Sequence, residues 1–270
     1  MIPALVDFVS IVSRNRALVR ELVLREIRQG HARHFLGTLW IFVHPLVITL
    51  TFMLIFGIVI GARLTIREDF PGDYTSYILA GLVPWFLTAA LLGRGPGIFI
   101  ANANLVKQVV FPIEILPFAA VIVSFIIYIP AFCLYIAYKL AFGGGVAAET
   151  VLLAPLALTL HVILALGICL ILAVLTPFLN DLRELVSVYS AVSMYFAPTI
   201  YLPDWVPGPL RPILYVNPYS YIAWVYQDAF FFGRIAHPFA WIVVAAMAVV
   251  TLFGGLILLR RIKPYLGNVL

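Results

Sequence analysis

Charged residues are scarce in this chain, and its long apolar runs contain none. Only 11% of the 270 residues are Asp, Glu, Lys or Arg, whereas 64% are hydrophobic, and the mean hydropathy is +1.09. This composition lies far outside the range of soluble globular proteins. It excludes a soluble core and predicts a single membrane domain.

Several energy-converting sites are also missing. No G-x-x-x-x-G-K-[ST] loop occurs, and the glycine run 143–145 lacks the lysine and hydroxyl that would hold phosphate and magnesium. The apolar runs hold no charged group for ion coupling, and His44 and His161 within them are expected to be hydrogen-bonded structural residues. We therefore expect a chain that neither hydrolyses ATP by itself nor couples to an ion gradient.

Cysteine is nearly absent. Cys133 and Cys169 both fall in apolar runs, where a thiol behaves as a small hydrophobic group. The sequence therefore indicates neither a disulfide framework nor a metal site, and we expect no metal or cofactor in this chain.

Six charge-free runs approach or exceed the roughly 20 apolar residues that a helix needs to span a bilayer. They cover residues 34–62, 74–93, 115–138, 150–180, 185–203 and 235–259. A seventh run, 212–227, is shorter and carries Pro212, Asn217 and Pro218, which is typical of re-entrant or interfacial helices. The sequence predicts an all-α integral membrane protein with six spans and a pair of short helices in the outer leaflet.

Basic residues are distributed unequally between the two sides of the predicted bilayer. Twelve of the 17 Lys and Arg residues lie in the N-terminal segment, the second and fourth loops and the C-terminal end. By the positive-inside rule both termini are cytoplasmic. The pI near 9.3 then reflects topology, and we expect no nucleic-acid partner.

Two segments outside the spans have a helical pattern. Residues 14–36 predict an amphipathic helix along the inner membrane surface. The segment 96–112 is too polar for lipid and too apolar for an ordinary loop, so we expect a short cytoplasmic helix that exposes Leu105, Val109 and Phe111 to a groove on another subunit. The alternative is an interfacial helix resting on lipid headgroups.

These elements give three expected parts. Residues 1–38 form the N-terminal cytoplasmic helix, residues 39–259 form the transmembrane domain and residues 260–270 form a cytoplasmic tail.

Short motifs follow one another in a fixed order along the whole chain. They are LGTLW from Leu36, HPL from His44, NANLVK from Asn102, FP at Phe111, NDLR from Asn180, APTIY from Ala197 and NP at Asn217. In this order and spacing the chain resembles the permease subunits of polysaccharide-export ABC transporters, which have a type-2 ABC exporter fold. Asn180, where many relatives carry Arg, leaves O-antigen, teichoic-acid and capsule exporters open, although APTIY is nearer to the first two.

The resemblance implies a homodimer in the bacterial inner membrane, joined to two copies of a separate ATPase subunit that binds ATP and magnesium. Its substrate would be a lipid-linked polysaccharide, with O-antigen favoured, moved among membrane lipids from the cytoplasmic to the outer leaflet.

The resemblance also assigns roles to individual residues. The N-terminal helix acts as a gate with Arg20, Arg25 and Arg28, and the second-loop helix couples to the ATPase. The coupling residues are Asn104, Leu105, Lys107 and Val109. The implied channel-lining aromatics are Trp40, Phe52, Phe56, Tyr195, Phe196 and Tyr201, each with lipid-facing or core packing as its alternative.

Two other functions stay open at this stage. A drug or small-lipid exporter would share the six spans and the coupling helix, but its dimer would close over a discrete hydrophobic pocket. A membrane-embedded glycan-processing enzyme would need an acid and a base that substrate can reach, and Asp204 with Asp228 is the candidate pair. We expect replacement of both carboxylates to leave function intact, because we expect no enzyme.

Overall fold

Helices are the only regular elements of the described structure. The computed structural model describes residues 2–29, 37–60, 72–108 and 111–270, and within these ranges it contains no strand. Five helical segments are long and apolar enough to cross a membrane. They are Gly37–Val59, Tyr74–Ala101, Ile115–Ala141, Thr150–Leu175 and Pro238–Val269. The predicted all-α membrane fold is confirmed.

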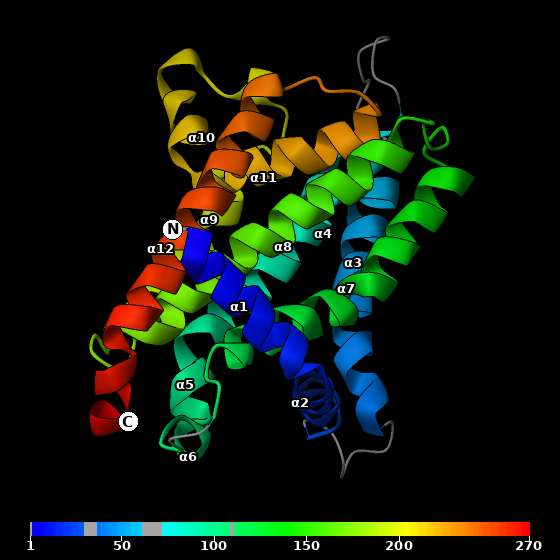
Figure 1. Cartoon of the computed structure of the whole chain (residues 1–270). Coiled ribbons are helices and arrows are strands. Elements are labelled where there is room, and N and C mark those ends of the chain that lie inside the picture. Colours follow the sequence, from blue (N-terminus) through cyan, green and yellow to red (C-terminus); the bar gives the residue numbers. More distant parts are fainter. Residues whose placement is uncertain (1, 30–36, 61–71, 109–110) are drawn as a thin grey trace.

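The membrane-crossing segments run between the two ends of the molecule (Figure 1). Their main helices are α3 (Trp40–Leu54, preceded by the 3-10 turn η1 at Gly37–Leu39 and extended by the π-helix η2 at Ile55–Ile60), α4 (Tyr74–Arg94), α7 (Ile115–Ala141), α8 (Thr150–Leu175) and α12 (Pro238–Val269). Burial separates these segments: 78% of the most apolar window of the α4 segment is buried, against 17% for the α3 segment. Helix α4 is therefore central, whereas α3 presents most of its surface to whatever surrounds the chain.

The predicted fifth span, 185–203, is a shorter helix. It consists of α9 (Leu182–Ser193) and a 3-10 turn, η5 (Met194–Phe196), after which Ala197 is extended with φ −119° and ψ 153°. Ala197 precedes Pro198, and the proline ring disfavours helical backbone at the residue before it. The helix therefore ends at Phe196, and the count of six spans stays a prediction.

A hairpin of short helices follows. It contains α10 (Pro212–Val216), α11 (Pro218–Gln227), the 3-10 turns η6 (Pro203–Trp205) and η7 (Gly208–Leu210), and the π-helix η8 (Asp228–Phe232). Asn217 begins α11, because its side chain accepts a hydrogen bond from the Tyr219 backbone N–H at 3.1 Å and Pro218 occupies the first helical position. The expected short helices are present, and their depth in a leaflet stays a prediction.

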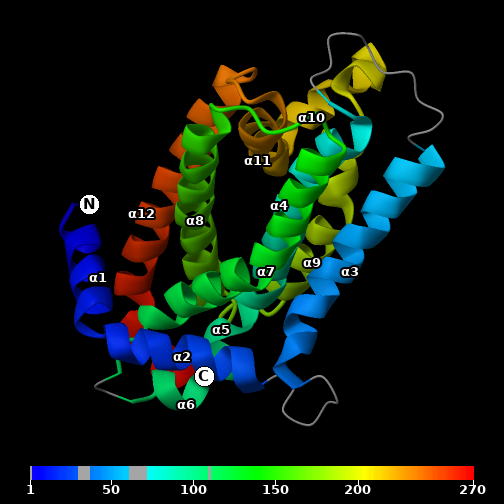
Figure 2. The same cartoon turned by 90° about the vertical axis from the view of Figure 1, so that its right-hand side faces the viewer.

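The N-terminal segment forms two helices where one was predicted. Helix α1 (Ile2–Arg14) and helix α2 (Arg16–Gln29) meet at Asn15, and residues 30–36 lie outside the described residues. Figure 2 shows α1 alongside α12 and α2 crossing below α7. Asp7 of α1 forms an ion pair of 2.6 Å with Arg260, so the two ends of the chain are in contact.

The second loop also differs in detail from its prediction. After the 3-10 turn η4 (Gly95–Gly97) it forms two one-turn helices, α5 (Ile98–Ala101) and α6 (Ala103–Val106). The break falls at Asn102, whose φ of −113° and ψ of 27° are not helical. We call residues 95–108 the loop helices.

Helices α8 and α12 form the most extensive helix pair of the structure. They approach closely at two glycines: a Cβ on Gly167 would collide with the α12 backbone at Thr251 and Leu252, and a Cβ on Gly255 would lie 2.8 Å from the Leu170 Cβ. Absence of a side chain lets the two backbones come together and bury both helix faces.

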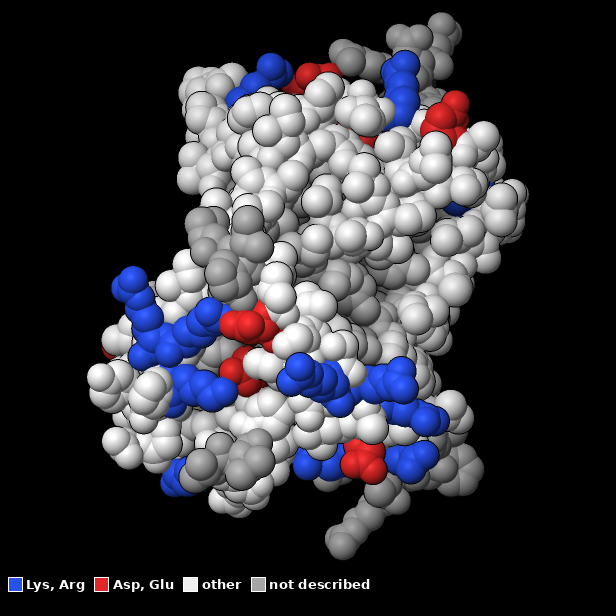
Figure 3. All heavy atoms as spheres, in the orientation of Figure 1, with Lys and Arg blue, Asp and Glu red and all other residues white. Residues whose placement is uncertain are grey.

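Charge is concentrated at one end. Figure 3 shows, on the face turned to the viewer, Lys and Arg gathered at the end that carries α2, a wide uncharged zone above them, and fewer basic residues at the opposite end. We call the end with α2, the loop helices and the last turns of α12 the basic end. Helix α12 continues through Val269, so residues 260–269 are helical, and their place in the cytoplasm stays a prediction.

Candidate functional site at the basic end

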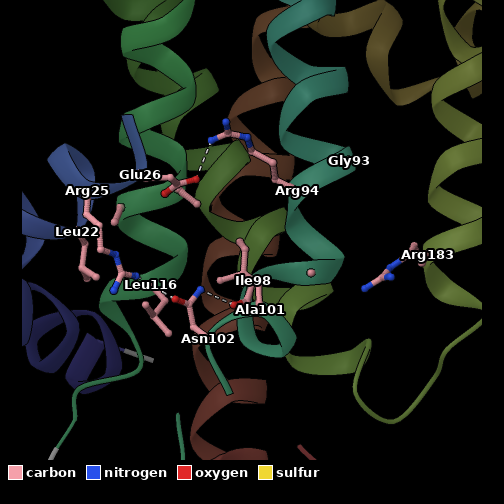
Figure 4. A pocket seen from close by; sticks show the side chains of 13 residues that line it. Leu22, Arg25, Glu26, Gly93, Arg94, Ile98, Ala101, Asn102, Leu116 and Arg183 are labelled. Carbon is pink, nitrogen blue, oxygen red and sulfur yellow. Dashed lines mark hydrogen bonds and ion pairs between the residues drawn. The ribbon is translucent and has the colours of Figure 1, made fainter. Parts of the chain in front are cut away.

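A pocket of about 560 Å³ lies where α2 meets α4, α5 and α7. Its polar lining comes from Arg25, Glu26, Arg94, Asn102 and Arg183. Figure 4 shows Arg25 and Glu26 reaching in from α2, Arg94 from the end of α4, and Arg183 pointing toward the pocket from the start of α9. We call it the arginine pocket.

Two polar contacts connect α2 to the helices behind it. Glu26 pairs with Arg94 at 2.9 Å, and Arg25 donates a hydrogen bond of 3.2 Å to the Asn102 side-chain oxygen. The Asn102 amide in turn donates to the Ile98 carbonyl at 2.9 Å, which fixes its orientation at the break between α5 and α6. Helix α2 is thereby attached both to a membrane-crossing helix and to the loop helices.

A second pocket, of about 690 Å³, lies between α2 on one side and α6 with the chain that follows it on the other. Leu18, Leu22 and Leu24 line one side and Leu105 and Phe111 the other. Leu105 and Phe111 are partly buried and line a groove with α2 of the same chain, and their predicted contact with another subunit stays a prediction. Apolar side chains on facing elements gain by sharing a surface removed from water. We call this pocket the loop groove.

The other predicted coupling and gate residues are mostly at the surface. Asn104 and Lys107 are exposed on and after α6, and Val109 lies outside the described residues. Arg28 lines the loop groove, and Arg20 is exposed on α2. The structure thus brings Arg25, Arg28 and Leu105 together.

Contacts that involve Glu114 were not foreseen as part of this site. Glu114, which precedes α7, is largely buried and pairs with Lys263 of α12 at 2.6 Å. A sequence separation of 149 residues leaves no local pattern from which this pair could be found. The last turns of α12 are consequently attached to the segment that follows the loop helices.

The predicted channel aromatics occupy separate places. Trp40 lines a pocket of about 320 Å³ with His44 and Arg94 near the basic end. Phe52 and Phe56 stack at a centroid distance of 5.9 Å farther along α3 and η2. All three aromatics belong to the segment Gly37–Val59, but Trp40 lies at the start of this segment and Phe52 and Phe56 lie near its end.

The remaining three aromatics lie around η5. Tyr195 and Phe196 are exposed, and the Tyr201 hydroxyl donates to the Tyr195 carbonyl at 2.8 Å. Tyr74, which sequence reasoning did not single out, connects the groups: its ring meets Phe56 edge-on at 6.2 Å, and its hydroxyl donates to the Ile200 carbonyl at 2.7 Å.

The candidate acid–base pair does not have the geometry of a catalytic site. Asp228 is fully buried, and its two oxygens accept hydrogen bonds from the His237 backbone, the His237 ring and the Trp241 indole at 2.7–3.0 Å. Asp204 is exposed on η6. Asp228 therefore holds the start of α12 against η8 through hydrogen bonds. In the part of the chain that the structure describes, no three His, Cys, Asp or Glu side chains are grouped so that they could hold a metal ion.

Comparison with known proteins places this arrangement in context. The family described as ABC-2 type transporter matches residues 17–231. An O-antigen export system permease protein of Klebsiella pneumoniae is 24% identical, over 91% of this chain and 92% of the relative. Another of Myxococcus xanthus is 26% identical over 88% and 89%. A polysialic acid transport protein of Escherichia coli is 27% identical over 91% and 93%.

Proposed function

The chain belongs to the ABC-2 type transporter family, and on that premise we propose that it is the membrane subunit of an ATP-driven exporter of lipid-linked polysaccharide. The observation that carries this proposal is the near full-length similarity to proteins named for O-antigen export and polysialic acid transport. Three of the five relatives are named for O-antigen export, which makes O-antigen the favoured substrate class.

In the proposed assembly two copies of this chain join two copies of a separate ATPase subunit in the bacterial inner membrane. The ATPase subunits bind ATP and magnesium, and both ends of each permease chain face the cytoplasm. The concentration of Lys and Arg at the basic end supports that orientation.

Coupling would begin at the loop helices. Asn104 and Lys107 are exposed there and would contact the ATPase, together with Val109. Arg25 bonds to Asn102, and Leu105 shares the loop groove with α2, so a push on the loop helices would displace α2 as well. Helix α2, with Arg20, Arg25 and Arg28, would act as the gate at the cytoplasmic end.

The polymer would move along aromatic surfaces. Sugar C–H faces pack on aromatic rings while hydroxyl groups hydrogen-bond at their edges, which gives weak contacts that a long chain can exchange. Tyr195 and Phe196 are 56% and 45% exposed and Trp40 is 41% exposed, so all three are accessible to a substrate. With Phe52, Phe56 and Tyr201 they are the candidate lining residues.

The export proposal is tested in the host cell. A strain without this chain should lose the polysaccharide from its surface and accumulate the lipid-linked form in the cytoplasmic leaflet, and a plasmid copy should restore export. Unchanged surface polysaccharide in the deletion strain would contradict the proposal.

The role of α2 is tested by reversing one ion pair. We expect Glu26→Arg and Arg94→Glu each to lower export per ATP hydrolysed, because each leaves two like charges facing one another, and the double variant to recover at least half of the loss. The measurement is polysaccharide export against ATPase rate in vesicles that contain the whole complex. Equal losses in the single and double variants would contradict a coupling role for this contact.

A further inference from the structure

We infer that the arginine pocket binds the phosphate headgroup of an anionic phospholipid from the leaflet at the basic end. The pocket shares Arg25 with the proposed gate helix and Arg94 with the pocket around Trp40, but the inference does not depend on the identity of the exported polymer.

The charge balance of the pocket favours an anion. Arg25, Arg94 and Arg183 line it, and Glu26 is the single carboxylate among its lining residues. Glu26 is paired with Arg94, so two guanidinium groups face the same cavity without a carboxylate of their own in that lining. Arginine does not lose its proton in proteins, and like charges around one cavity repel each other. A bound anion removes that repulsion.

The donors are directed into the cavity. Figure 4 shows Arg183 pointing into the space between α5 and α9 with no interaction drawn to it, while Arg25 uses one guanidinium nitrogen for Asn102. The Arg183 Nη2 lies 3.9 Å from the place of a Cβ at Gly97, so it reaches the cavity wall. Guanidinium groups can bind phosphate oxygens through two parallel hydrogen bonds.

The position of the pocket favours a lipid over a soluble anion. Ala101 is the last residue of the candidate membrane span Tyr74–Ala101, Leu116 is the second residue of the span Ile115–Ala141, and both residues line the pocket. The ends of such spans lie at the level of lipid headgroups. Leu22, Ile98 and Leu116 add apolar surface to the same lining, which suits the glycerol and acyl portion of a lipid.

Small residues leave room for the headgroup. Gly93, Gly97 and Ala101 come from α4 to α5, and Ala119 and Ala120 come from α7. A Cβ added at Gly93 would meet no atom within 4 Å, so this wall is open space. Basic pockets between membrane helices on the cytoplasmic side bind anionic lipid headgroups in other membrane proteins.

The test uses the complete chain in phosphatidylcholine nanodiscs that contain increasing amounts of phosphatidylglycerol, with retained lipid counted by native mass spectrometry. We expect the unmodified chain to retain phosphatidylglycerol, Arg183→Gln to weaken retention about fivefold, and Arg25→Gln with Arg183→Gln together to weaken it about 25-fold. The matched control is Arg261→Gln, which removes an exposed arginine at the same end, outside this pocket, and should leave retention unchanged.

A variant without a charge change keeps the inference testable if the arginine variants fold poorly. Gly93→Leu fills the open wall of the pocket, and we expect it to abolish specific retention while all arginines remain. Equal retention in every variant would overturn the inference.

Two competing ligands are distinguished in the same experiment. Complete displacement of phosphatidylglycerol by millimolar inorganic phosphate would identify a soluble-anion site and overturn the lipid assignment. Retention of the host's lipid-linked glycan in place of phosphatidylglycerol, with the same sensitivity to Arg183→Gln, would identify a substrate site and overturn it as well.

Discussion

His161 lies fully inside the apolar interior, yet both of its ring nitrogens have partners. Thr88 already donates its hydroxyl hydrogen to the Pro84 carbonyl at 2.8 Å, so it accepts from Nε2–H of His161 at 3.1 Å. The other nitrogen, Nδ1, then accepts from the Tyr226 hydroxyl at 2.8 Å. A single neutral tautomer satisfies all of these bonds, and the predicted structural role of this histidine is confirmed.

Replacement of His161 should weaken the fold without a specific effect on export. His161→Ala leaves the Tyr226 hydroxyl without its acceptor in a buried place, which costs about 1–3 kcal/mol of unfolding free energy. Thermal unfolding in detergent measures this loss. Thr159→Ala is the control on the same helix, because Thr159 is an exposed residue that bonds only its own helix at Pro155, and it should melt within a degree or two of the unmodified chain.

Asp228, the buried carboxylate at the opposite end, accepts hydrogen bonds from His237 and Trp241, so its replacement should lower stability. Asp228→Ala leaves the Trp241 indole and the donors of His237 without this acceptor, so we expect a loss of about 1–3 kcal/mol for the buried indole alone. Asp204→Ala, at an exposed position, should change unfolding by less than about 0.5 kcal/mol. The measurement is the unfolding curve of each variant together with its export activity. If both variants were as stable as the unmodified chain but lost activity, Asp204 and Asp228 would again be candidates for a catalytic pair.

Long-range polar contacts were beyond sequence reasoning. Lys139 is the clearest case, since counting charges could assign it only to the side of the bilayer opposite the cytoplasm and not to any partner. The structure buries it, with its ammonium group donating to the carbonyls of Phe230 and Phe231 at the end of η8 and lying 5.1 Å from the Phe231 ring centroid. A separation of more than 90 residues has no periodic signature.

At the scale of single elements, hydropathy predicted well where the helix is long and uniform. The runs that begin near residues 74, 115, 150 and 235 correspond to α4, α7, α8 and α12. For 185–203 the helix is shorter than the apolar run, because Pro198 disfavours helical backbone at Ala197, and a fifth span there stays a prediction. Hydropathy also missed the breaks at Asn15 and Asn102, where each asparagine amide donates a local hydrogen bond to the backbone carbonyl four residues earlier.

The glycine approach between α8 and α12 gives an element-scale prediction. Gly167→Ala places a Cβ against backbone atoms of α12, which cannot rotate away as a side chain would, so we expect a loss of about 1–3 kcal/mol. Gly254→Ala is the matched control, because a Cβ there meets nothing within 4 Å, and alanine favours helix over glycine by up to about 1 kcal/mol. Comparable destabilisation by both substitutions would show that the close approach is not what limits packing at Gly167.

The whole chain gives a topology prediction. In a background without Cys133 and Cys169, Lys107→Cys and Arg261→Cys should react with a membrane-impermeant maleimide only after the inner membrane is opened. Glu149→Cys, which is exposed between α7 and α8 at the opposite end, should react in cells whose outer envelope alone is permeabilised. Labelling of Lys107→Cys and Glu149→Cys from the same side would contradict the orientation.

For the site at the basic end, the sequence predicted which segments take part, but not which side chains contact one another. Sequence reasoning identified the N-terminal and loop segments and named Arg25 and Leu105, which the structure brings to α2 and the loop helices. It missed Glu26, Arg94 and Arg183, because their relation depends on how α2, α4 and α9 are placed in three dimensions. Roles in coupling, gating and substrate contact remain predictions.

The pairing of α8 with α12 has a consequence for biosynthesis. Ribosomes synthesise chains from the N-terminus, so α8 can enter the bilayer before α12, its principal partner, has been translated. Until the last helix arrives, the groove at Gly167 has no α12 backbone to fill it, and Asp7 and Glu114 have no Arg260 or Lys263. Chains cut short before α12 therefore lack the backbone that packs against Gly167, and the carboxylates of Asp7 and Glu114 lack the basic partners that they have in the complete chain.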